Sequence, residues 1–421
     1  MKKLTAMLLG FAMLLSLAAC GGQPGGTQNG SQNGSSGAAT NETIKIGVLE
    51  DLSGDFALVG NQKLHAAQVA VEEINKAGGV LGRQLEIIAP DAQSDTDRTV
   101  EMARKLILED QVAVVMGPYT SAAREAIRPL FEDNGALLFY NNQYEGGVAS
   151  HNVFCTGAVP EQQVLPLVEY LAGEGAKTYY ILTADYNFGW ICADWFKTAC
   201  DQYDSEIVGE EFVPLSVGQF ASSISKIQLA DPDVLIAMPV GNTQTAFYEQ
   251  WNATQQGDTP MCSTGALVQT YEHKRFAAPA LNNMYVTTNY LEEIDSEASN
   301  AFKDAWHAMF PDEPYIGEEA EAEYVGVHLW AKAVEQAGTT EVEAVIAALE
   351  TGISIEAPSG TVTIDPATHH CIRDIYLVHC DEQHNVSEIR NWKAVAPDWL
   401  SKSKGIDLTK SSPNEQYTPI D

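Results

Sequence analysis

Positively charged side chains are scarce in this chain. Its 421 residues include 24 lysines and arginines against 57 aspartates and glutamates, which gives a formal net charge of −33 at pH 7. A protein of that sign repels the phosphate backbones of nucleic acids and the surfaces of anionic membranes. We therefore expect no nucleic-acid partner.

Catalytic motifs are also absent. The sequence contains no nucleophile elbow, no HExxH zinc motif and no glycine-rich dinucleotide loop. The run His369-His370-Cys371 is a weak metal candidate, because neighbouring residues of a strand point to opposite faces. We expect a protein that is not an enzyme, with no catalytic residues, no metal and no cofactor.

The cysteines show no CxxC spacing or other metal-site pattern. Cys192 and Cys200 lie two turns apart on one predicted helix, roughly 12 Å at the standard rise, so they cannot bridge each other. Buried small side chains or a single structural disulfide remain the two interpretations. The six cysteines beyond position 20 are Cys155, Cys192, Cys200, Cys262, Cys371 and Cys380.

The N-terminus has the pattern of an export signal. Lys2 and Lys3 precede an apolar run, Leu4–Leu17, that is too short to span a bilayer. Ala18-Ala19 followed by Cys20 resembles the lipobox of bacterial lipoproteins, which predicts a signal over 1–20 and lipidation of Cys20. Residues 21–42, rich in Gly, Ser, Asn and Gln, are expected to form a flexible tether. The protein would then lie outside the cytoplasm and contact the membrane through its lipid alone.

The rest of the chain alternates between short apolar runs and helical patterns. Ile44–Leu49 reads as a strand, and Leu64, Ala67, Val71 and Ile74 follow it at helical spacing. Such alternation predicts parallel sheets covered on both faces by helices. Further strands are predicted over 85–89, 112–116, 136–140, 178–183, 207–213, 234–237, 360–364 and 372–379.

Two separate runs of this alternation predict two doubly wound α/β lobes. The C-terminal part continues neither run, so we expect it to cross back and complete both lobes through a multi-strand hinge. The crossings are expected near Gly157–Pro160, Thr288–Leu291 and Pro358–Thr361. The first lobe would comprise 43–158 plus 289–358, and the second 159–288 plus 359–421.

The loops that follow the predicted strands carry a candidate binding site, because ligands of open α/β sheets bind beyond the carboxyl ends of the strands. These loops hold aromatic, hydroxyl and carboxamide groups and no lysine or arginine, which suits a small neutral polar molecule. Ser121 could instead only cap its helix, and Tyr140 and Tyr144 could cover a sheet edge. The candidate ligand-binding residues are Tyr119, Ser121, Tyr140, Asn142, Tyr144, Tyr186, Phe188 and Gly241.

Several of these loops resemble those of the urea and short-chain-amide solute-binding proteins of ABC transporters, which share the type 1 periplasmic-binding fold with branched-chain amino-acid binders. The resemblance covers nearly everything from Ile44 to Val386. It rests on Gly117–Ser121, Leu138–Gly146, Asn152–Gln163, Asp185–Phe188, Gly209–Leu215, Ala357–Pro366 and His369-His370.

The resemblance implies a two-lobed receptor that closes on a small amide and delivers it to an ABC permease. By position, the family's enclosing residues correspond to Tyr119 with Ser121, Tyr140 with Asn142, and Tyr186 with Phe188. The amide could be larger than urea, and another small neutral solute is an alternative. A branched-chain amino acid is a further alternative ligand, and a sensor for a separate signalling protein is an alternative role.

The lipobox interpretation predicts the effect of Cys20→Ser. The substituted protein should fold normally but leave the membrane fraction, because lipid and not protein surface would hold it there. Fractionation of cells followed by immunoblotting measures this. Retention of the variant in the membrane pellet would contradict the lipobox.

Overall fold

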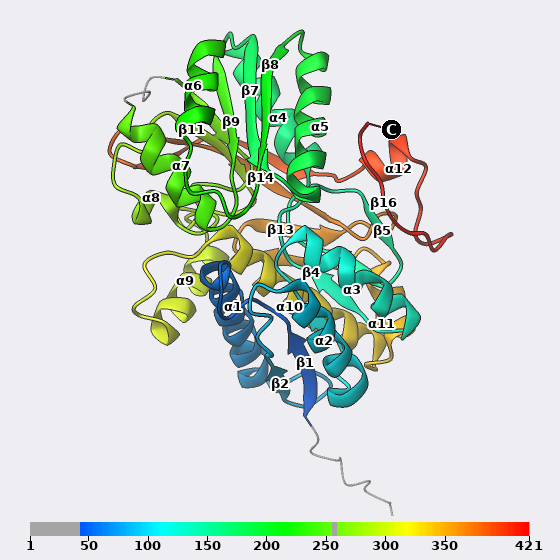
Figure 1. The fold of residues 1–421 in the computed structure, drawn as a ribbon. Helices are drawn as coiled ribbons and strands as arrows, with labels where there is room; N and C mark the ends of the chain where they lie inside the picture. The colour runs from blue at the N-terminus through cyan, green and yellow to red at the C-terminus, as the bar shows by residue number, and fades with distance from the viewer. Residues whose placement is uncertain (1–42, 255–258, 421) are drawn as a thin grey trace, which may run out of the picture. The chain divides into compact units, whose positions relative to one another are not determined.

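The computed structural model describes residues 43–254 and 259–420, and these form one compact unit. The predicted signal, the tether and Cys20 lie outside the described residues. Two α/β lobes are visible, one built mainly from the N-terminal third of the chain and one from its middle (Figure 1). Among the described residues, no helix combines the length and apolar character needed to cross a membrane.

The first lobe contains a five-stranded parallel sheet in the order β2-β1-β3-β4-β6. Its strands are β1 (Ile44–Val48), β2 (Leu85–Ile88), β3 (Val115–Met116), β4 (Leu138–Tyr140) and β6 (Val153–Cys155). The helices associated with it are α1 (Ala57–Lys76), α2 (Thr96–Lys105) with the π-turn η1 (Leu106–Asp110), α3 (Ser121–Asp133), α9 (Glu297–Met309), α10 (Glu318–Ala337) and α11 (Val342–Leu349).

The second lobe is built on a longer mixed sheet in the order β12-β13-β14-β11-β10-β9-β7-β8, with β15 paired to β14. The β12–β13 end of this sheet reaches the core of the first lobe. Its strands are β7 (Thr178–Ala184), β8 (Glu206–Val213), β9 (Val234–Met238), β10 (Met261–Ser263), β11 (Met284–Thr288), β12 (Ser354–Ala357), β13 (Gly360–Ile364), β14 (Cys371–Cys380) and β15 (Val386–Val395). Its helices are α4 (Pro160–Gly173), α5 (Asn187–Gln202), α6 (Ala221–Ala230), α7 (Asn242–Ala253), α8 (Glu272–Arg275) and α12 (Trp399–Ser403).

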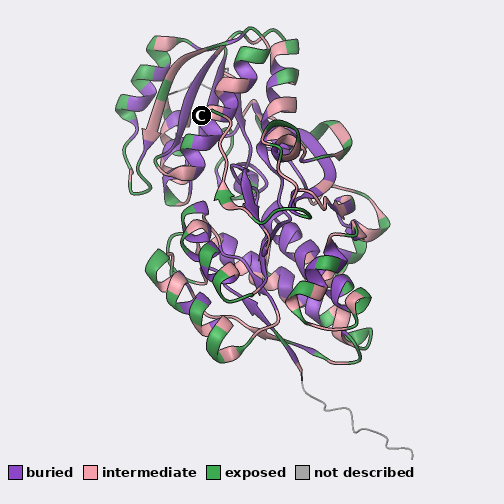
Figure 2. Ribbon diagram, turned by 90° about the vertical axis from the view of Figure 1, so that its right-hand side faces the viewer, coloured by how far each residue is buried: buried purple, intermediate pink, exposed green. Residues whose placement is uncertain are grey.

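The expected α/β alternation is confirmed in both lobes. Apolar side chains of the strands form the cores, as the buried strands and exposed outer helix faces in Figure 2 show. Capping residues begin several helices where the sequence changes from strand to helix. Asp95 accepts the backbone N–H of Arg98 at 2.8 Å to begin α2, and Thr120 accepts that of Ala123 at 3.1 Å to begin α3.

The strand β14 joins the two cores. Its first residue, Cys371, packs with Val362 and Ile364 in the core of the first lobe, whereas Leu377 belongs to a core of the second. The last crossing therefore runs along β14, beyond the segment Pro358–Thr361 that the sequence indicated. All six cysteines of the described chain are buried and free.

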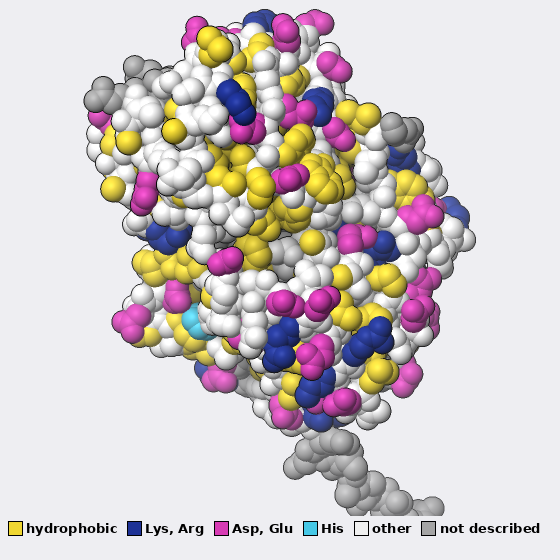
Figure 3. Space-filling view, viewed as in Figure 1, with side chains coloured by type: hydrophobic (Ala, Val, Ile, Leu, Met, Phe, Trp, Pro, Cys, Tyr) yellow, Lys and Arg dark blue, Asp and Glu magenta, His cyan; other side chains and the backbone are white. Residues whose placement is uncertain are grey.

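A short two-stranded sheet was not expected from the sequence. The strand β16 (Asn414–Gln416) pairs with β5 (Val148–Ser150), which places these tail residues on the first lobe although the sequence grouped them with the second. Neither strand carries the alternating apolar pattern that marks a half-buried strand. On the face drawn in Figure 3, acidic and basic side chains are dispersed over the outer surface, while apolar side chains gather near the boundary between the lobes.

Gly157 provides a test of how tightly the first crossing is built. A Cβ at this position would lie 1.9 Å from the backbone oxygen of Asn142, in the loop that follows β4. We expect Gly157→Ala to displace that loop and to lower the free energy of unfolding by about 1–3 kcal/mol in urea titrations.

Gly173 is the matched control, since a Cβ there would meet no atom within 4 Å. Gly173→Ala should leave the free energy of unfolding unchanged or raise it by about 0.5–1 kcal/mol, because alanine favours the helix. Equal effects of the two substitutions would contradict the close approach at Gly157.

Candidate functional site

A pocket between the lobes lies at the carboxyl ends of the strands. It has a volume of about 30 Å³, where a single water needs roughly 10–15 Å³. Loops after β3 and β4 line it from the first lobe, and loops after β7, β9 and β10 from the second. The lining residues are Tyr119, Thr120, Ser121, Tyr140, Asn142, Gln143, Tyr186, Phe188, Met238, Pro239, Val240, Gln244, Ser263, Thr264, Gly265, Ala266 and Gln269.

Most residues singled out from the sequence meet in this pocket. The exceptions are Tyr144 and Gly241, which do not line it. The residues that the structure brings together are Tyr119, Ser121, Tyr140, Asn142, Tyr186 and Phe188.

Tyr144 lies behind the pocket wall instead of in it. Its phenol hydrogen-bonds to Nε2 of His370, whose Nδ1 lies 2.7 Å from the carbonyl oxygen of Thr368. The carbonyl can only accept, so His370 carries its proton on Nδ1 and Tyr144 is the donor. Burial lowers the pKa of His370 to about 4, which keeps the imidazole neutral. Tyr144 therefore supports the loop and offers its hydroxyl to a histidine.

Gly241 lies beside the pocket, next to a second cavity that also includes Tyr119 and Gln244. Its φ of 67° suits glycine, and a Cβ would lie 2.8 Å from the ring of Phe56 in the first lobe. Glycine here lets Phe56 approach the second lobe closely.

Asn142 lines the pocket, but its carboxamide is already engaged. Its oxygen accepts from Lys63 Nζ at 2.8 Å, and its nitrogen donates to the backbone oxygen of Pro118 at 2.7 Å. The sequence had suggested that this group would serve the ligand. The structure shows it holding the loops after β3 and β4 in place.

Lys63 is a fully buried cation below the pocket, and sequence analysis missed it. Its Nζ lies 2.6 Å from Glu50 Oε1 and 3.8 Å from Glu323 Oε2. Burial acts to lower the pKa of Lys63, but the two carboxylates outweigh burial and raise it. Within a helical pattern this lysine reads as a solvated residue, since no local signal reports a buried partner more than two hundred residues away.

Glu319, at the start of α10, is a buried carboxyl close to the pocket. It accepts the backbone N–H of Gln143 at 3.2 Å and Nε2 of Gln269 at 2.8 Å. Burial raises its pKa to about 7, against the lowering effect of Lys63. Gln143 and Gln269, both pocket residues, are thus oriented by one carboxyl group.

The lining itself is uncharged. Among the described residues that border the pocket there is no Asp, Glu, Lys, Arg or His. Burial raises the pKa of the Tyr119 and Tyr186 phenols well above their ordinary value, so both stay neutral. The pocket therefore offers aromatic faces, hydroxyl groups and carboxamides to a ligand.

The two lobes make polar contacts around the pocket. Asn242 Nδ2 donates to Asp55 Oδ1 at 2.8 Å, and Trp195 Nε1 donates to the backbone oxygen of Glu145 at 3.1 Å. These bonds join second-lobe helices to first-lobe loops. The lobes are therefore in direct polar contact in the described structure.

Sequence analysis missed several glutamines and small residues of the pocket. Gln244 and Gln269 come from helical or irregular segments after β9 and β10, and Ser263 and Thr264 end or follow β10. These residues could have been found only from their position directly after a strand. That position is visible in the sequence only when the strand itself has been predicted.

The family model for periplasmic binding proteins matches residues 43–385. The chain belongs to this family. Its α/β architecture is the type 1 periplasmic-binding fold, as the resemblance implied. The family consists of extracytoplasmic solute-binding proteins and not of enzymes.

Curated relatives are similar over most of their length. Leu/Ile/Val-binding protein homolog 6 of Brucella melitensis is 23% identical over 81% of this chain and 88% of that protein. The leucine-, isoleucine-, valine-, threonine- and alanine-binding protein of Pseudomonas aeruginosa is 27% identical over 77% of this chain and 86% of that protein.

Solved structures share the fold. A solute-binding protein of an ABC transporter from R. palustris, in complex with 4-hydroxybenzoate, superimposes with a TM-score of 0.78 at 23% identity, covering 86% of this chain and 100% of that one. The branched-chain amino-acid binding protein LivJ from Streptococcus pneumoniae, in complex with isoleucine, gives 0.73 at 23%, covering 85% and 100%.

The pKa of Glu319 predicts a pH dependence of stability. Its ordinary value is near 4.5, so between pH 4.5 and about 7 the native protein binds a proton that the unfolded chain releases. The free energy of unfolding should therefore fall as the pH rises through this window, with Glu319 contributing about 1–3 kcal/mol. Urea titrations at several pH values measure this.

Glu319→Gln should make the free energy of unfolding decrease less steeply between pH 4.5 and about 7. This expectation concerns the slope and holds whatever the substitution does to stability at a single pH. Glu249→Gln, which changes an exposed residue of α7, serves as the control and should leave the slope as in the unmodified protein. An unchanged slope in Glu319→Gln would show that this carboxyl is ionised throughout.

Proposed function

We propose that this protein captures a small neutral polar solute, urea or a short-chain amide, in the pocket between its lobes and delivers it to an ABC permease. The observation that carries the proposal is the uncharged lining of hydroxyl, carboxamide and aromatic groups. Such groups form hydrogen bonds with an amide without requiring a counter-charge.

The size of the pocket supports a small solute. About 30 Å³ of free space accommodates only a few non-hydrogen atoms in the described structure. Cavities of about 90 and 140 Å³ adjoin it at Tyr119, so a longer amide could extend past that ring.

A branched-chain amino acid is the second candidate, favoured by the names of the relatives. Its ammonium group would need an anionic partner, since an unpaired buried charge is costly. Two carboxyl groups that contact lining residues are already engaged: Glu145 pairs with Arg124 Nη2 at 2.7 Å, and Glu319 accepts from Gln143 and Gln269. The neutral solute therefore fits the pocket better.

Anchoring and partners complete the proposal. Lipid attached to Cys20 would hold the protein at the outer face of the cytoplasmic membrane, where the 21–42 tether lets the body reach a permease. A role as a ligand sensor uses the same pocket and differs only in the partner.

Calorimetry with urea, acetamide and leucine tests the ligand. The amides should bind and leucine should bind more weakly. Tyr119→Phe should weaken amide binding about five- to two-hundredfold. This factor corresponds to about 1–3 kcal/mol, the cost of leaving a buried polar group of the ligand without its hydrogen-bond partner.

Tyr285→Phe is the matched control, because Tyr285 is a half-buried tyrosine on β11 that stacks near His379 and does not line the pocket. It should bind as the unmodified protein does. Tight leucine binding with no response to any amide would overturn the amide assignment and leave the amino-acid candidate.

A further inference from the structure

Ser121 of the pocket is hydrogen-bonded to a buried carboxylate behind it. Its Oγ donates to Glu145 Oε2. Ser121 borders the pocket, whereas Glu145 is fully buried and does not. This hydrogen bond therefore leads from the pocket to Glu145.

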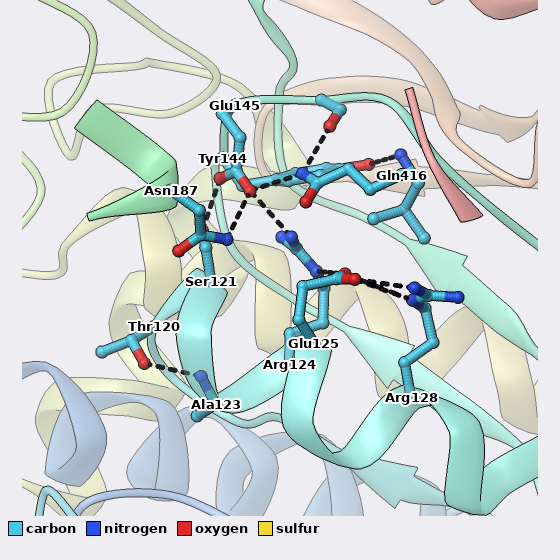
Figure 4. A network of polar contacts seen from close by, with 12 residues as sticks. Thr120, Ser121, Ala123, Arg124, Glu125, Arg128, Tyr144, Glu145, Asn187 and Gln416 are labelled. Carbon is cyan, nitrogen blue, oxygen red and sulfur yellow. Dashed lines mark hydrogen bonds and ion pairs between the residues drawn. The ribbon is translucent and has the colours of Figure 1, made fainter. Parts of the chain in front are cut away.

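Glu145 is surrounded by donors from three parts of the chain, namely α3, α5 and β16. Its Oε1 accepts from Arg124 Nη2 at 2.7 Å, Asn187 Nδ2 at 3.3 Å and Gln416 Nε2 at 2.6 Å. Figure 4 shows these groups and Ser121 around the carboxylate. Paired with a buried guanidinium, Glu145 is an ionised group that can only accept hydrogen bonds.

The direction of the proton in this hydrogen bond follows. A carboxylate has no hydrogen to give, so the single hydroxyl hydrogen of Ser121 points to Glu145. The Ser121 hydroxyl is therefore left with lone pairs only for a ligand.

We propose that Glu145 is a positioning residue that fixes Ser121 as an acceptor, so that this corner of the pocket selects a solute presenting N–H donors and rejects a carboxylate. The inference rests on the proposed function and deepens it. An amide NH2 group can donate a hydrogen to this acceptor. A carboxylate would set its lone pairs against those of the Ser121 hydroxyl, which costs affinity.

Acetamide and acetate form a near-isosteric pair that isolates this effect. We expect the unmodified protein to bind acetamide at least about tenfold more tightly than acetate. One unfavourable polar contact raises the dissociation constant by about this factor. The ratio of the two dissociation constants, measured by calorimetry, is the readout. A role of Glu145 in folding alone would weaken both ligands by the same factor and leave the ratio unchanged.

Glu145→Gln should reduce this preference about tenfold or more and weaken acetamide binding. The amide oxygen of the new side chain would stay with Arg124, Asn187 and Gln416, which are all donors. Its NH2 group would then face Ser121 and donate to it, turning the serine hydrogen toward the pocket. A carboxylate ligand would gain a donor, while an amide would lose an acceptor.

Glu125→Gln is the matched control. Glu125 lies on the same helix and contacts the same arginine, with Oε1 3.0 Å from Arg124 Nε, and its substitution removes the same charge. It does not line the pocket, so the ratio should stay as in the unmodified protein. If Glu145→Gln fails to fold, Ser121→Ala replaces it. That variant leaves the Glu145–Arg124 pair intact and should also reduce the acetamide preference.

The outcomes separate the two proposals. Amide binding with a ratio that neither Glu145→Gln nor Ser121→Ala reduces overturns the positioning role and leaves the proposed function standing. Tighter binding of acetate than of acetamide by the unmodified protein overturns the positioning role directly. If the unmodified protein binds leucine but neither acetamide nor acetate, the proposed function is overturned. The positioning role of Glu145 is then overturned as well.

Discussion

A buried ammonium group below the pocket is the interaction on which the site depends. Lys63 extends from α1 to Glu50 after β1, to Glu323 on α10 and to Asn142 after β4. Four elements of the first lobe are therefore joined at one point. Charges removed from water this completely must be paired, so the loss of any partner would leave the others unsatisfied. The loops of the pocket take their positions from this arrangement.

The same principle accounts for the uncharged pocket. Two buried guanidinium groups outside the lining each form an ion pair within the protein: Arg124 with Glu145, and Arg373 with Glu321 at 2.6 Å. Neutral hydroxyl and carboxamide groups form the surface itself. Paired charges in the second layer can orient these groups and set which of them donate or accept.

Contacts between the lobes use the same residues that organise the pocket. Glu145 accepts from Asn187 at the start of α5, and the tail residue Gln416 reaches the same oxygen. Phe56 of the first lobe packs against Tyr119, with ring centroids 5.3 Å apart, and approaches Gly241 of the second. These contacts hold the two lobes against each other in the described structure.

The sequence by itself determined the alternation of strands and helices and the location of most pocket residues, because apolar periodicity and loops after strands are local signals. Tyr119, Ser121, Tyr186 and Phe188 were found in this way. Tertiary structure decided which neighbours turn inward: Tyr144 meets His370, which is 226 residues away, and Asn142 is held by Lys63. The polar strand β16 and the buried Glu145 network also depend on distant partners. A side chain's charge partner is set by packing, and no local pattern records it.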